Sequence, residues 1–104
     1  MAIEITEIQD SATTVYTSTG NSAVTFASFC NISGSSDTLD VYVVPDTDTA
    51  DDTNIVIKQL SVNTADTHQL YLGGEKLLLE DGDTLQATAG TAGAFTAVVS
   101  YTSI

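Results

Sequence analysis

The sequence contains no arginine and no tryptophan, and Lys58 and Lys76 are its only strongly basic side chains. Against them stand fourteen Asp and Glu residues, so the formal net charge is −12 at pH 7. A charge of this sign repels the phosphates of nucleic acids and the anionic membrane surfaces that recruit Lys and Arg clusters. We therefore expect neither nucleic acid nor membrane as a partner. An acidic surface of this kind keeps neighbouring proteins apart until a specific contact overcomes the repulsion.

Cysteine and histidine are each present once, as Cys30 and His68. A single cysteine excludes an intrachain disulfide, and one Cys with one His cannot supply the three or four soft ligands of a zinc site. The apolar neighbours of Cys30 predict a small buried hydrophobe rather than a reactive thiol. No nucleophile motif accompanies His68, which we expect to be a partly exposed strand residue. We expect no catalytic residue, no cofactor and no enzymatic activity; a small hydrolase built on His68 or on converging carboxylates is the weakest alternative.

The sequence also lacks the features of a targeting signal and of a membrane-spanning segment. The first residues, Met1 to Glu7, have neither a basic region nor an apolar core like those of a signal peptide. No apolar run approaches the length of a membrane span. These features predict synthesis and folding in a cytosol.

Short runs rich in Thr, Val, Ile and Tyr fill the 104 residues, separated by polar turns at intervals of roughly ten to twelve residues. No window supports a long amphipathic helix. This pattern predicts an all-β fold, an antiparallel β-sandwich (jelly-roll-like or Ig-like) of about eight strands. The length fits one domain over residues 1–104.

Three local signals make specific predictions. The Asp81-Gly82 pair, between two β-type runs, predicts a hairpin because glycine accepts the positive φ of its turn. Pro45, the only proline, should end a strand because it cannot donate to a ladder. Alternation over residues 22–32 predicts one core-facing set and places Phe29 on the opposite face. The predicted core-facing set is Val24, Phe26, Ser28, Cys30 and Ile32.

An acidic loop, residues 46–53, offers carboxylates that suit Ca²⁺, which prefers six to eight oxygen ligands. Counted from Asp46, the sixth position is Asp51 instead of the EF-hand glycine and the twelfth is Ile57 instead of glutamate. This favours a solvated loop and no metal site, with Ca²⁺ binding at Asp46–Asp52 as the alternative.

Residues 1–10 form a candidate strand-exchanging or docking arm, because isoleucines nearly alternate with polar residues there. The candidate interface residues are Ile3, Ile5 and Ile8.

Several segments along the chain together carry a family likeness. They are Thr14 to Val24, Cys30-Asn31, Val41 to Pro45, Asn54-Ile55, Lys76 to Ala87 and Val98 to Tyr101. With these segments the chain resembles the small β-sandwich virion structural proteins of tailed bacteriophages, of the marine and cyanophage type.

The resemblance implies a non-enzymatic capsid decoration (cement) protein, made in the host cytoplasm, that binds the outer head shell and stabilises it. Its implied partners are the major capsid protein, other virion subunits and further copies of itself, with a trimer favoured. The alternative is a tail-fibre, tail-tip or head–tail component with a receptor- or glycan-binding role.

Overall fold

The computed structural model describes residues 2–70 and 77–104, and all of its regular structure is β-strand. The strands are β1 (Ala2–Ile8), β2 (Thr13–Thr17), β3 (Ser22–Asn31), β4 (Asp37–Val44), β5 (Ile55–Val62), β6 (Thr67–Leu70), β7 (Leu77–Leu79), β8 (Thr84–Ala89) and β9 (Phe95–Ser103). Within the described ranges no helix is long and apolar enough to cross a membrane.

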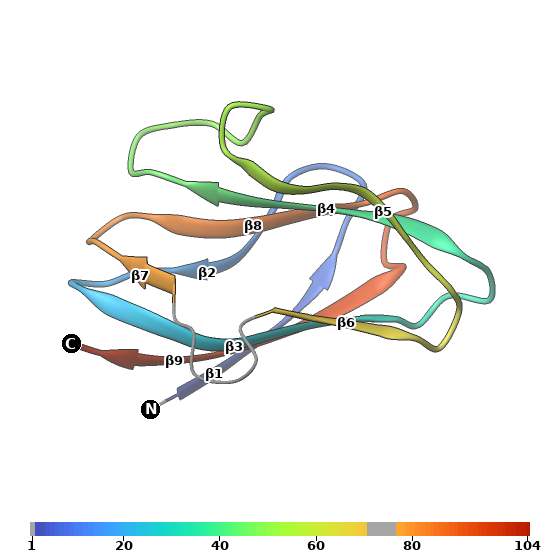
Figure 1. The fold of residues 1–104 in the computed structure, drawn as a ribbon, viewed down its shortest axis with the longest axis horizontal. Helices are drawn as coiled ribbons and strands as arrows, with labels where there is room; N and C mark the ends of the chain where they lie inside the picture. The colour runs from blue at the N-terminus through green and yellow to red at the C-terminus, as the bar shows by residue number, and fades with distance from the viewer. Residues whose placement is uncertain (1, 71–76) are drawn as a thin grey trace.

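The strands form two antiparallel sheets packed face to face (Figure 1). The five-stranded sheet has the order β1-β9-β3-β6, and β7 pairs with the other half of the β3 edge. The four-stranded sheet has the order β2-β8-β4-β5. The predicted all-β antiparallel sandwich is confirmed, with nine strands in the described residues where about eight were expected. As predicted, β4 ends at Val44, directly before Pro45.

Most connections carry the chain from one sheet to the other. Among the described strands, β4 and β5 are the only consecutive pair that hydrogen-bond to each other. The Asp81-Gly82 turn forms, with Gly82 at φ 88°, but β7 before it pairs with β3 whereas β8 after it pairs with β2 and β4. The predicted hairpin is therefore wrong. A glycine at positive φ serves any tight turn, so the local signal does not say which sheet the next strand joins.

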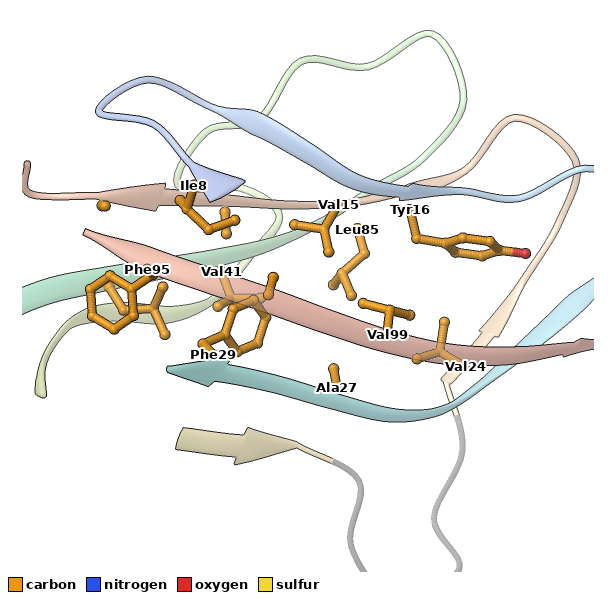
Figure 2. Packing of buried hydrophobic residues seen from close by; sticks show 14 of the residues in the cluster. Ile8, Val15, Tyr16, Val24, Ala27, Phe29, Val41, Leu85, Phe95 and Val99 are labelled. Carbon is orange, nitrogen blue, oxygen red and sulfur yellow. The ribbon is translucent and has the colours of Figure 1, made fainter. Parts of the chain in front are cut away.

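The core lies between the two sheets and consists of aliphatic and aromatic side chains (Figure 2). Its largest fully buried members are Phe29, Phe95, Ile8, Leu39 and Leu85. Each comes from a different strand, so the two layers interlock over their whole area. Burying side chains of this size contributes about 1.5–3 kcal/mol each relative to leaving them exposed.

The alternation predicted for residues 22–32 fails at one position. Val24 pairs with Tyr101 and Phe26 with Ser100, so Thr25 is an extra residue in β3 and forms a bulge. One inserted residue moves every later side chain to the opposite face. Phe29 is therefore fully buried, whereas Phe26, Ser28 and Cys30 lie on the outer side. This corrects two predictions, the core-facing set beyond Val24 and the burial of Cys30, which is only half-buried.

A buried asparagine fixes the end of β3. The Asn31 side chain is fully buried and donates to the carbonyl oxygens of Ser35 (3.0 Å) and Val62 (2.9 Å). Its own oxygen accepts hydrogen bonds from the Ser33 backbone N–H and hydroxyl. Because every polar atom of the amide has a partner, its hydrogen bonds offset the desolvation cost and hold the β3–β4 loop and the end of β5 together.

Candidate docking surface

Strand β1 forms one edge of the five-stranded sheet. It pairs with β9 of its own chain in unbroken register, from Ala2 opposite Tyr101 to Ile8 opposite Phe95. Ile8 is fully buried in the core, whereas Ile3 and Ile5 are 65% and 70% exposed. Of the three candidate interface residues, only Ile3 and Ile5 are therefore open to a neighbour. The N-terminal segment lies in the sheet as a strand, and β9 is its only partner among the described strands.

The side chains that point away from the four-stranded sheet form a continuous surface, here called the outer face. The registers place Ile5 beside Val98 and Val98 beside Ser28, and they place Ile3 beside Ser100 and Ser100 beside Phe26. Its members are Ile3, Ile5, Glu7, Ala23, Phe26, Ser28, Cys30, Thr67, Gln69, Leu78, Thr96, Val98, Ser100 and Thr102. Glu7 is the only charged residue that the described strands place on this face.

The carboxylates gather at loops and turns instead. Asp83 accepts the backbone N–H groups of Asp46 and Glu80, each at 2.9 Å, and Asp81 accepts the Gly20 N–H at 2.8 Å. These hydrogen bonds tie three connections together at one end of the sandwich: β2–β3, β4–β5 and β7–β8. The acidic side chains of Asp81 and Asp83 thus serve as turn acceptors, a common role of aspartate in loops.

The acidic loop has its own internal contacts. The Thr53 hydroxyl and backbone N–H both donate to Asp51, and these hydrogen bonds hold the pKa of the Asp51 carboxyl below its ordinary value. Asp52 forms an ion pair with Lys58 at 2.8 Å, and this hydrogen bond with its charge raises the pKa of Lys58. Across residues 2–70 and 77–104, no three His, Cys, Asp or Glu side chains are grouped as ligands of one ion. Lys76 lies outside these ranges.

Cys30 and His68 come close in the sheet, but their side chains do not meet. Cys30 pairs with Thr67, and His68 pairs with Phe29. Because neighbouring residues of a strand point to opposite faces, the thiol lies on the outer face and the imidazole on the side of the core. His68 is half-buried, as its sequence context predicted. The structure therefore does not assemble the two residues into a nucleophile and base pair.

Two shallow hollows open on the surface. One, of about 220 Å³, lies between the two sheets at the β1 edge and is lined by Glu4 and Thr6 of β1 and residues 14–17 of β2. The other, of about 440 Å³, is lined by residues 30–33 with Thr64 and Ala65. Hydroxyl groups and backbone dominate the first lining, and this hollow opens beside β1.

A scan of protein-family models, a search of curated proteins and a search of solved structures found no match to this chain. The functional argument therefore starts from the surface itself: a nearly charge-free sheet face with exposed isoleucines on a strongly acidic molecule. Sequence reasoning had found Ile3 and Ile5 but missed the rest of the outer face. The bulge at Thr25, which brings Phe26 and Ser28 to that face, has no distinct signal in the sequence.

Proposed function

We propose that the chain is a virion structural subunit, a decoration (cement) protein that docks its outer face on the outer head shell of a tailed phage. The observation that carries the proposal is the separation of charge: the molecule has a net charge of −12, yet Glu7 is the only charge among the described residues of this face. Its other residues are apolar side chains, hydroxyls, Cys30 and one amide. A surface of this composition suits contact with another protein.

The energetics fit a repeated weak contact. Desolvating two exposed isoleucines and Val98 would contribute about 1.5–3 kcal/mol for each side chain that becomes fully buried. That gain is modest once the cost of association is subtracted. A capsid offers the same site many times, and subunits that contact several neighbours at once gain effective affinity. The outer face would therefore bind with the highest effective affinity to a lattice that repeats its binding site.

The virion setting itself is supported by the family resemblance. The segments that carry it include strand residues, such as Val41 to Pro45, and the turn at Asp81-Gly82. On this proposal the major capsid protein is the main partner, and neither nucleic acid nor membrane is required. A decoration protein stabilises the head by bridging neighbouring capsid subunits, which requires a stiff scaffold such as this sandwich.

A second candidate function is receptor or glycan binding at a tail tip or fibre. It is favoured by one observation, the end of the sandwich where Asp46, Asp81 and Asp83 tie three connections into one rim. Such a rim would present loops in fixed positions, as binding modules do. The two functions use different surfaces and different partners, so binding to heads and binding to host cells distinguish them.

The test adds one negative charge at matched positions on the two sheets. Ser28→Glu places a carboxylate at the centre of the outer face, and Gln86→Glu places one on the outward side of β8 in the other sheet. Purified protein is mixed with heads of the parent phage that lack this subunit, and occupancy is measured by co-sedimentation and cryo-EM. We expect saturating binding for the wild type and Gln86→Glu, and at least tenfold weaker binding for Ser28→Glu. Binding to host cells and not to heads would support the tail function instead.

A further inference from the structure

Four of the five edge strands carry features that discourage pairing with another chain. β5 has two register shifts against β4, and it carries Lys58 and a positive φ at Gln59. β2 has a shift between Thr14 and Tyr16, and β6 and β7 have only four and three residues. Bulges, lysines and short length are the usual devices that protect sheet edges.

β1 has none of these three features, and its one edge-protecting device is the charge of Glu4, which points to the inner side of the sheet. It is seven residues long, pairs with β9 at seven successive positions without a shift, and contains neither proline nor lysine. No described strand covers its second edge, and the hollow lined by Glu4 and Thr6 opens beside it. Alternate residues of such a strand direct their N–H and C=O groups away from the existing partner, so this edge offers unused donors and acceptors.

We propose that β1 pairs in antiparallel fashion with β1 of a second copy, about a two-fold axis that passes beside Ile5. Ile5 is the middle residue of Ala2–Ile8, so this register pairs all seven residues of both strands. The same sequence then serves as both halves of the ladder, which is the requirement of an isologous interface. The pairing goes beyond the proposed docking function and does not depend on it.

The register follows from the positions of the two carboxylates. With the axis at Ile5, Glu4 of each copy lies opposite Thr6 of the other, and Glu7 lies opposite Ile3. An axis at Glu4 would bring the two Glu4 side chains directly opposite each other, which is unfavourable for like charges. An axis at Thr6 would pair only residues 4–8. The central register alone pairs the full length without placing two acids directly opposite each other, and it leaves the two Glu4 side chains as diagonal neighbours at about 7–8 Å.

The exposed isoleucines then meet across the proposed interface between the two β1 strands. Ile5 of one copy faces Ile5 of the other on the outer face, with Cβ atoms about 4.5–5.5 Å apart, and each Ile3 lies diagonally at about 7–8 Å. These are the two most exposed apolar side chains of β1. A β-branched pair of this kind is a favourable cross-strand contact, so the pairing covers part of the apolar surface that the single chain leaves in water.

A second copy fits this edge better than a basic peptide. A basic strand would be drawn to Glu4 and Glu7, but the centre of β1 offers isoleucine, which a second β1 matches in length and in side chain. Two copies of charge −12 approach most easily where neither carries opposed charges, and the central register provides that contact. The two-fold axis stands perpendicular to the sheet, so both outer faces lie on the same side and form one surface.

Cross-linking tests the register directly. In a Cys30→Ala background, Ile5→Cys places the two new thiols opposite each other at the axis, within the distance that a disulfide requires. Ile3→Cys, the matched control, places them four residue positions apart, too far to bridge. After mild oxidation we expect a covalent dimer from Ile5→Cys and none from Ile3→Cys, measured by non-reducing electrophoresis. Equal cross-linking of both, or of neither, would overturn the proposed pairing.

Solution mass tests the association without new covalent bonds. We expect the wild type to sediment as a reversible dimer, and Ile5→Lys, which opposes two ammonium groups at the axis, to weaken association at least tenfold. Val56→Lys adds the same charge at a residue 53% exposed on β5 and should leave the dimer intact. Circular dichroism checks that both variants fold. A wild-type monomer at all concentrations, or the trimer favoured by the family resemblance, would overturn the two-fold pairing.

Discussion

Single residues show where this fold is sensitive to substitution. Gly82 has a φ of 88°, and a Cβ built on it would lie 2.5 Å from the Asp46 carboxyl group. Positive φ costs a residue with a side chain about 1–2 kcal/mol, and the clash requires the Asp46 side chain to move as well. The position therefore depends on glycine for its conformation and for the space that the neighbouring loop occupies.

We expect Gly82→Ala to lower the free energy of unfolding by about 2 kcal/mol or more, measured by urea denaturation. Gly34→Ala is the matched control, because a Cβ there meets nothing within 4 Å and its φ is not positive. The control should change stability by less than about 0.5 kcal/mol. Equal losses in the two variants would show that Asp46 does not pack against the turn.

At the scale of elements, the sequence predicted strands well and their connections poorly. The runs that became β4 and β5 were recognised because β-branched residues alternate with polar ones, and Pro45 marked one end. The Asp81-Gly82 turn was recognised, but its role as a link between sheets depends on which strands pair, and pairing is decided by contacts far along the chain. The bulge at Thr25 was missed because it is defined by the register of β3 against β9, which the sequence of β3 alone does not contain.

The same limit applies to the candidate docking surface. Ile3 and Ile5 stand out in the sequence as apolar residues in a polar segment, and the structure leaves both exposed. Phe26 and Val98 do not stand out, because their runs also contain core residues. The registers of β3 against β9 and of β9 against β1 are needed to show that both residues lie on the same face as Ile3 and Ile5.

The proposed pairing of β1 also predicts how its backbone amides exchange hydrogen with solvent. In an antiparallel strand, alternate residues direct their N–H and C=O groups to the same neighbour. One set of β1 amides should therefore be protected by β9 at every protein concentration. The other set should exchange rapidly in dilute solution and slowly in concentrated solution, where a second copy pairs. Residue-resolved hydrogen exchange at two protein concentrations checks this, with the central strand β9 as an internal control. If the exchange of the β1 amides that point away from β9 did not depend on concentration, the pairing would be contradicted.

For the whole molecule, charge determines how association responds to salt. Two copies that each carry a net charge of −12 repel one another, and the proposed β1–β1 interface places no two charges directly opposite each other. Raising the ionic strength from about 0.01 M to about 0.15 M shortens the Debye length from about 30 Å to about 8 Å. We expect the self-association constant to increase over this range, measured by analytical ultracentrifugation. A decrease would mean that attraction between unlike charges, for example at Lys58, holds the copies together.

The order of the five-stranded sheet also has a consequence for biosynthesis. β9, the last of the described strands, lies between β1 and β3, which are among the first to be synthesised. Until β9 leaves the ribosome, neither β1 nor the adjoining edge of β3 has its native partner, and Phe95 cannot complete the core. Pairings this distant in sequence form slowly compared with local ones. The nascent chain must therefore carry exposed strand edges from the synthesis of β1 until that of β9, a period in which a chaperone would protect it from aggregation.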